Sequence, residues 1–303
     1  MQKATWLVLL GVLSVSVSGP MVKLALMAGA TPVTVAFLRM GVTALALGVP
    51  ALRSGALRGM LRVPWKWKGL ALLASFFLAL HYTAWMTSLQ KTGTFASVAL
   101  VCAQPLFVAV FSALLLREPI PRRSIPGAVT AMAGAVGIGL LSATGRGGDL
   151  LGDLLAFSGA ITMAGHWLCG RAVRRHAPAM GYLVFVYACT ALMLAAALPF
   201  MGGFSAPVGS LPYIGVLIAV CTLAGHALFT YALGFVRADL ISFALLGEPI
   251  GAAAWAWFLF DERVGWQMML GGGLVLAGLA WYLLSMRRAP PYAKGLKTEG
   301  VKS

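Results

Sequence analysis

Apolar runs of about twenty residues recur along the whole chain, with short polar breaks between them. A helix of that length crosses the roughly 30 Å hydrocarbon core of a bilayer. In lipid, every backbone N–H and C=O needs a partner within its own helix or barrel, and the sequence lacks the alternating ten-residue strands of a barrel. We therefore predict an all-α polytopic membrane protein with ten transmembrane helices. The expected spans are 4–28, 32–51, 67–89, 94–116, 124–142, 149–171, 178–200, 211–235, 238–260 and 265–285.

Charged residues are scarce, which excludes a water-facing shell. The chain is 60% hydrophobic and 10% charged, whereas soluble domains carry charge at about a quarter of their positions. The net charge of +15 could suggest nucleic-acid binding, but the basic residues lie between the apolar runs instead of on one soluble face. We expect the lipid bilayer as a partner and no nucleic acid.

The basic residues are distributed unevenly between the two sides of the ten predicted spans. Of the 23 Lys and Arg, only Lys91, Arg146 and Arg263 fall in the loops of one side, while Lys23 and Arg39 fall inside spans. The remaining eighteen share the other side with both termini. The positive-inside rule therefore predicts a bacterial inner-membrane protein with both termini in the cytoplasm. Lys23 and Arg39 are expected to snorkel to headgroups or to form structural pairs, with substrate binding as the alternative.

An internal repeat runs through the chain at an offset of about 144 residues. Gln104-Pro105 corresponds to Glu248-Pro249, and Gly127 and Gly134 correspond to Gly271 and Gly278. Each half holds five spans, an odd number, so the second half is expected to enter the membrane inverted relative to the first. We predict a first repeat at 1–145, an inverted repeat at 146–286, and a basic, disordered cytoplasmic tail at 287–303.

These features resemble the drug/metabolite transporter superfamily, in its EamA-type branch. The resemblance rests on the two five-helix halves, the Gln-Pro and Glu-Pro pairs, an acid at the end of each of those helices, and Thr31-Pro32 leading into Phe37-Leu38-Arg39. It covers essentially the whole chain and implies secondary transport, commonly export of amino acids or related metabolites. Amino-acid and aromatic-metabolite exporters are the most similar members. The first span departs from the pattern, because Leu13-Ser14-Val15 stands where many members carry Trp-Gly.

Glu248 is the acid that lies deepest in a predicted span. An ionised acid at that depth costs roughly 2.5–3.5 kcal/mol on insertion scales, so it must be protonated, paired or hydrated. We expect it to bind a proton or a substrate amine, with neutral helix packing as the alternative. Its repeat mate Gln104 can hydrogen-bond but cannot titrate. Pro105 and Pro249 each remove a helix hydrogen bond, which frees a carbonyl for a ligand or only kinks the helix.

Histidine and aromatic residues near mid-span complete the predicted substrate site. His81, His166 and His226 can titrate near neutrality, and each could instead donate to a neighbouring helix. Nearby aromatic rings would suit an aromatic or amphipathic substrate, although such rings also form interfacial belts. The predicted substrate-binding set is His81, Tyr82, Trp85, Gln104, His166, Trp167, His226, Tyr231 and Glu248, with Pro105 and Pro249 as helix kinks.

We predict a secondary active transporter that exports a small metabolite, foremost an amino acid, by alternating access, with protons as a candidate coupling partner. The alternatives are a membrane-embedded enzyme and a channel, but no G-x-S-x-G or H-E-x-x-H motif occurs. Four cysteines lie inside predicted spans, so we expect no disulfide, metal or cofactor. Residues 1–20 resemble a signal peptide; we expect them to be retained, because removal would leave nine spans.

Overall fold

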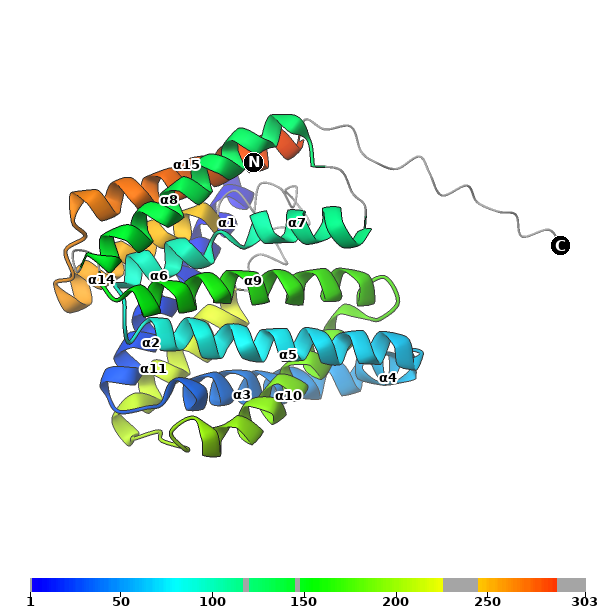
Figure 1. The fold of residues 1–303 in the computed structure, drawn as a ribbon. Helices are drawn as coiled ribbons and strands as arrows, with labels where there is room; N and C mark the ends of the chain where they lie inside the picture. The colour runs from blue at the N-terminus through cyan, green and yellow to red at the C-terminus, as the bar shows by residue number, and fades with distance from the viewer. Residues whose placement is uncertain (1, 117–119, 145–147, 226–244, 288–303) are drawn as a thin grey trace.

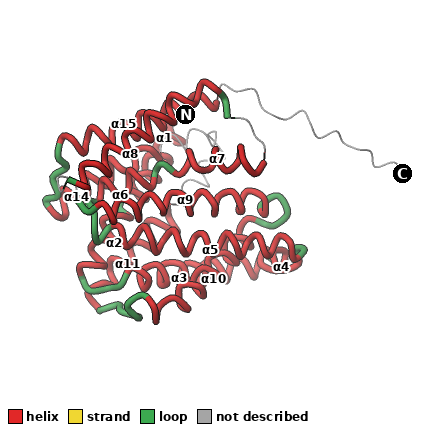
Figure 2. The backbone as a smooth tube through the Cα atoms, viewed as in Figure 1, coloured by secondary structure: helices red, strands yellow, loops and turns green. Residues whose placement is uncertain are grey.

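The computed structural model describes residues 2–116, 120–144, 148–225 and 245–287, and the description below applies to them. These residues form a bundle of helices joined by short loops, with no β-strand among them (Figures 1 and 2). The prediction of an all-α membrane protein is thereby confirmed for the described part of the chain. Of the predicted tail at 287–303, only Arg287 is described, as the last residue of helix Trp266–Arg287; the rest lies outside the described residues.

The helices follow the predicted spans closely, and several spans are built from two helical pieces. The α-helices are α1 (Gln2–Ser16), α2 (Ser18–Met27), α3 (Pro32–Arg53), α4 (Ala56–Arg62), α5 (Trp65–Ser88), α6 (Thr94–Val101), α7 (Gln104–Leu116), α8 (Ile125–Ala143), α9 (Leu150–Val173), α10 (Ala179–Ala197), α11 (Leu211–Val216), α14 (Glu248–Phe260) and α15 (Trp266–Arg287). The 3-10 turns are η1 (Arg122–Ser124), η2 (Leu198–Phe200), η3 (Val208–Ser210) and η5 (Leu245–Gly247), and η4 (Leu217–Ala224) is a π-helix.

Seven helical stretches in the described residues are long and apolar enough to cross a membrane. They are Leu9–Met27, Pro32–Arg53, Trp65–Ser88, Thr94–Leu114, Arg122–Ala143, Ala179–Phe200 and Trp266–Ser285, and each matches a predicted span. Three predicted spans are not among them. The sixth corresponds to α9, which has 24 residues but carries Asp153, His166 and Arg171. The eighth and ninth are described only in part, so the number ten stays a prediction.

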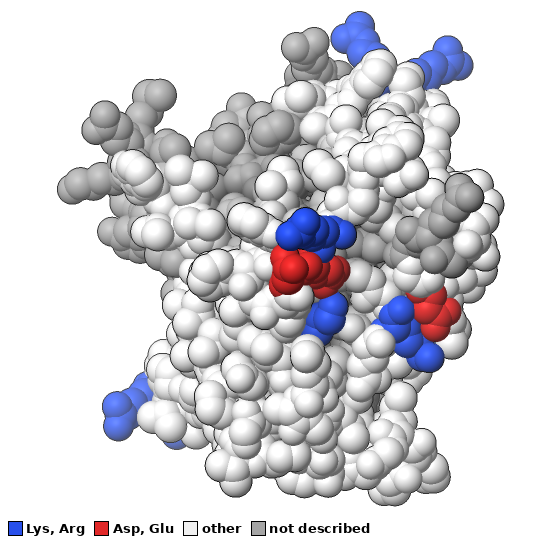
Figure 3. Space-filling view, turned by 90° about the vertical axis from the view of Figure 1, so that its left-hand side faces the viewer, with Lys and Arg blue, Asp and Glu red and all other residues white. Residues whose placement is uncertain are grey.

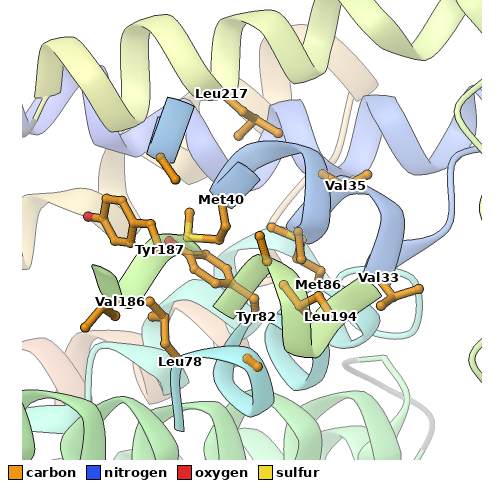
Figure 4. Packing of buried hydrophobic residues seen from close by; sticks show 14 of the residues in the cluster. Val33, Val35, Met40, Leu78, Tyr82, Met86, Val186, Tyr187, Leu194 and Leu217 are labelled. Atoms are coloured by element: carbon orange, nitrogen blue, oxygen red, sulfur yellow. The ribbon is translucent and has the colours of Figure 1, made fainter. Parts of the chain in front are cut away.

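Helices from the first half of the chain pack beside helices from the second half. In Figure 1, α8 and α15 lie along one edge, α3 and α10 along the other, and α9 and α5 between them. One buried apolar cluster joins α2, α3, α5, α10 and α11, and Figure 4 shows Tyr82 and Tyr187 beside Met40 within it. A second cluster includes Phe95, Ile138 and Val275 and joins α6, α8 and α15.

Both proline pairs stand at the start of a helix that follows an interruption. Helix α6 ends at Val101, and α7 begins with Gln104-Pro105. The 3-10 turn η5 likewise precedes α14, which begins with Glu248-Pro249. A proline is well tolerated in the first turn of a helix, because the N–H it lacks would have no intrahelical partner there. The interruptions therefore fall at the two positions that the repeat relates.

Helices α8 and α15 cross in backbone contact at four glycines. A Cβ on Gly127 would lie 2.7 Å from the carbonyl oxygen of Gly278, and one on Gly134 would lie 2.6 Å from that of Gly271. Because Gly271 and Gly278 are the repeat mates of Gly127 and Gly134, each contact is the counterpart of the other. Such reciprocal contacts are the signature of two copies related by a two-fold axis.

A carboxylate ties three segments together at the end of the bundle where α14 stops. Glu262 accepts from Lys23 Nζ at 2.7 Å, from the Thr94 backbone N–H at 2.7 Å and from the Thr94 hydroxyl at 3.0 Å. It thereby joins α2 to the first turn of α6. In Figure 3, which faces this end, acidic side chains lie in two places, each beside basic ones. Lys23 is thus paired rather than snorkelling.

Candidate functional site

Arg39 is buried at the centre of a polar cluster among the helices. It lies seven residues after the start of α3, and only 6% of its surface is exposed. Its Nε donates to the Thr222 hydroxyl at 2.9 Å, and its Nη1 donates to the Ser18 hydroxyl at 3.0 Å. The guanidinium carbon also lies 5.2 Å from the centre of the Tyr82 ring, within cation–π range. The snorkelling interpretation of Arg39 is wrong, because so little of the residue reaches the surface.

The helix that supplies Thr222 is widened at this point. Residues Leu217–Ala224 form a π-helix, and the Thr222 hydroxyl donates to the Leu217 carbonyl five residues earlier. This bond uses the hydroxyl hydrogen, so the oxygen is left to accept from Arg39. Short π-helical segments within α-helices often occur at functional sites.

Three aromatic side chains lie together on one face of α5, and the Tyr82 ring among them adjoins Arg39. His81 stacks on Trp85, with ring centres 5.9 Å apart, and meets Tyr82 edge-on at 5.1 Å. All three are buried, with Tyr82 and Trp85 exposed by less than a tenth. The Trp85 indole nitrogen is buried and has no hydrogen-bond partner in the described part of the protein. The structure therefore brings together three residues of the predicted substrate-binding set.

His81 and His166 each bond to the backbone of a neighbouring helix. His81 Nδ1 lies 2.9 Å from the Gly159 carbonyl oxygen in α9, and His166 Nδ1 lies 3.0 Å from the Ala74 carbonyl oxygen in α5. A carbonyl oxygen only accepts, so Nδ1 carries the hydrogen in both rings and Nε2 is left for a second interaction. These bonds are of the kind expected for helix packing, and they fix both ring orientations between α5 and α9.

Glu248 approaches the cluster from the second half of the chain. It is the first residue of α14, is partly buried, and lies within electrostatic range of Arg39 and of the thiols of Cys102 and Cys221. The positive end of the α14 dipole favours a negative charge at this position. Among the described residues, Glu248 and Arg39 are not in direct ion-pair contact. The two opposite charges therefore lie near each other without being joined.

The remaining predicted site residues divide into three groups. Gln104 has a buried side-chain oxygen with no hydrogen-bond partner in the described residues, at the interruption between α6 and α7. Trp167 meets His166 edge-on but is 53% exposed, so it is not part of the buried cluster. His226 and Tyr231 lie outside the described residues, so their place in the substrate-binding set stays a prediction.

Sequence reasoning missed the hydroxyls that hold Arg39. Ser18 and Thr222 are 204 residues apart in the chain, and small hydroxyl residues are common in membrane helices as simple packing groups. The burial of Arg39 itself was also missed, since its distance from the span end is compatible with a side chain that reaches the headgroups. A signal was present in the Phe37-Leu38-Arg39 segment, which the resemblance had already marked.

Helices long and apolar enough to cross a membrane, with a buried polar cluster among them, are typical of a membrane transporter of small molecules. The model of the EamA-like transporter family matches the chain twice, over residues 2–140 and 150–284. The chain therefore belongs to the EamA-like transporter family, and the predicted resemblance is confirmed. A solved crystal structure has a similar fold, with a TM-score of 0.64 and 18% identity, covering 95% of this chain and 99% of its own. A comparison with curated protein sequences found no match.

Proposed function

We propose that this protein is a secondary active transporter that exports a small metabolite, foremost an amino acid, across the bacterial inner membrane by alternating access. The observation that carries the proposal is the composition of the buried cluster. Arg39 and Tyr82 come from the first half of the chain, while Thr222 and Glu248 come from the second. Inverted-repeat transporters bind their substrate near the bilayer midplane, at a polar site to which both repeats contribute.

The contacts between repeat mates support an inverted arrangement of the two halves. The reciprocal glycine contacts between α8 and α15 have the form that a two-fold axis produces, and α3 packs on α10 as α6 packs on α14. Because α8 and α15 run antiparallel at the crossing, such an axis would lie across the helices, in the membrane plane. Exchanging the conformations of the two halves would then open the shared site to the opposite side.

Counterflow in proteoliposomes is the test of this function. We expect vesicles preloaded with the unlabelled substrate to accumulate the same labelled compound transiently, because a carrier exchanges bound substrate across the membrane. The panel consists of the twenty amino acids and simple aromatic acids. A channel would only equilibrate the label, and a membrane-embedded enzyme would convert it to a product visible by chromatography. Either result would replace the transporter proposal with the corresponding alternative.

Glu248→Gln is expected to remove the pH dependence of transport while leaving exchange measurable. Glutamine keeps the shape of the side chain and its hydrogen-bonding oxygen but cannot bind or release a proton. The measurement is the counterflow rate between pH 5.5 and pH 8.5. Asp149→Asn is the control, because Asp149 is exposed and lies at the start of α9. A Glu248→Gln profile that still follows the wild-type curve rejects proton coupling through this residue.

A further inference from the structure

Arg39 carries a buried positive charge that no carboxylate contacts in the described part of the protein, although Glu248 lies within electrostatic range. Two neutral hydroxyls accept its hydrogen bonds, and no described carboxylate lies within ion-pair distance. A charge removed from water is costly unless an opposite charge and a full set of hydrogen bonds compensate it. Charged groups placed this way inside membrane proteins mark substrate or ion pathways by default. The chemistry that would complete the site is therefore that of an anion.

Several hydrogen-bond donors of Arg39 and of its aromatic neighbours have no acceptor among the described residues. An Arg side chain has five N–H donors in a rigid fork, and Ser18 and Thr222 occupy two of them. The ring of Trp85 lies 6.4 Å from that of Tyr82, which contacts the guanidinium, and its indole N–H is buried and unpartnered among the described residues. Buried tryptophan N–H groups usually find an acceptor. Within the described part of the protein, three guanidinium N–H groups and the Trp85 indole N–H therefore have no acceptor.

We propose that Arg39 is the anion-binding residue of the transport site and that the transported compound carries a carboxylate. The planar fork of an Arg matches the two oxygens of a carboxylate. Tyr82 and Trp85 would contact the apolar body of such a compound, and Ser18 and Thr222 hold the guanidinium in place from two different helices. The inference rests on the proposed transport function and narrows it, because it excludes simple amines as substrates.

The competing explanation is that Arg39 only cross-links α3 to Ser18 and Thr222. The two explanations differ in what Arg39→Met does to the protein without substrate. If the charge serves a ligand, removing it eliminates a buried charge that no described carboxylate contacts, and the melting temperature stays the same or rises. Thr222 keeps its own bond to Leu217, so it is not left without a partner. If Arg39 is a cross-link, the melting temperature of the empty protein falls.

The experiment measures binding and transport separately on the purified full-length protein. Binding is read as the rise in melting temperature caused by each of four probes, namely L-phenylalanine, 3-phenylpropionate, L-phenylalaninamide and 2-phenylethylamine, and by the twenty amino acids as a panel. Transport is read as counterflow of whichever compound binds. The variants are Arg39→Met and Arg39→Lys, with Arg263→Met as the control, because Arg263 is 81% exposed.

We expect compounds with a carboxylate to stabilise the wild type and the Arg263→Met control, and the amide and the amine to have no effect. Arg39→Met should weaken that binding about thirtyfold or more, the loss typical of removing one partner of a buried charge pair. Arg39→Lys should restore part of it, since the charge returns without the fork. Stabilisation by the amine, or by no carboxylate in the panel, overturns the inference, as does a fall in the melting temperature of empty Arg39→Met.

The two proposals fail in different ways. If binding depends on Arg39 but no counterflow is seen, the anion site is supported and the transport function is rejected. Counterflow of 2-phenylethylamine at the same rate in the wild type and in Arg39→Met keeps the transport function and removes the anion site.

Discussion

Replacing Gly278 with valine is expected to lower the stability of the protein by about 3 kcal/mol, the upper end of the usual range for overpacking. A Cβ at Gly278 would lie 2.3 Å from the Ala131 backbone nitrogen and 2.6 Å from the Gly127 carbonyl oxygen. Both atoms belong to the backbone of α8, so neither can move aside as a flexible side chain would. The two helices must separate, and the closely packed second core cluster opens with them.

Gly273→Val in the same helix is the matched control, because a Cβ there meets no other group within 4 Å. Both variants place a β-branched residue in α15, so the intrinsic helix cost is the same and only the crossing differs. The measurement is the fraction of protein that stays monodisperse in detergent after heating. Equal melting temperatures for the two variants would show that α8 and α15 do not cross in backbone contact.

Glu262→Gln is expected to open the end of the bundle that the carboxylate holds closed. The substitution removes the negative charge that pairs with Lys23. It also replaces one carboxylate oxygen with an NH2 group, which cannot accept a hydrogen bond from Lys23 or Thr94. Hydrogen bonds to charged groups contribute roughly 1.5–3 kcal/mol each, so the closed arrangement should lose enough stability to raise opening about tenfold. The measurement is the rate at which a membrane-impermeant maleimide labels a cysteine at Ala96, a residue 1% exposed, in a background without native cysteines.

Asp261→Asn is the control for this experiment. Asp261 adjoins Glu262 in the chain, but its contact with Arg263 spans 3.5 Å between side chains that are mostly exposed, and such pairs contribute little. Lys23→Met should reproduce part of the Glu262→Gln effect, because Thr94 keeps its acceptor. If Glu262→Gln labels no faster than the wild type, the carboxylate does not hold this end closed.

The fold was predictable from sequence where lipid imposes it. The length of the apolar runs was enough to locate the seven stretches that the structure confirms. Unpaired backbone groups are costly in hydrocarbon, and a helix pairs them within its own segment. The interruptions before Gln104 and Glu248 could also be anticipated, since proline cannot continue a helix hydrogen-bond ladder. Helix α9 is harder to assess by hydropathy, because packing against α5 gives its polar residues partners that a hydropathy scale does not count.

The site was predictable only in part, because a buried contact depends on residues far apart in the chain. The proximity of His81, Tyr82 and Trp85 was predictable because helical spacing puts them on one face of α5. The position of Arg39 was not, since nothing near it in sequence indicates that Ser18 and Thr222 would meet it. Trp167 is a tryptophan beside a histidine like Trp85 near His81, yet it lies on the exposed face of its helix, 53% exposed. Periodicity in so apolar a helix carries little information about which face is buried.

The widened helical segment Leu217–Ala224 has a consequence for how the protein changes shape. Its carbonyls are paired one residue further along than in an ordinary helix, so a return to ordinary pairing would turn the stretches on either side of it by roughly 100° relative to each other. Thr222 sits within that segment, and the turn would carry its hydroxyl off the guanidinium. A one-residue slip in backbone pairing would thus separate the Arg39 guanidinium from the Thr222 hydroxyl that accepts its hydrogen bond.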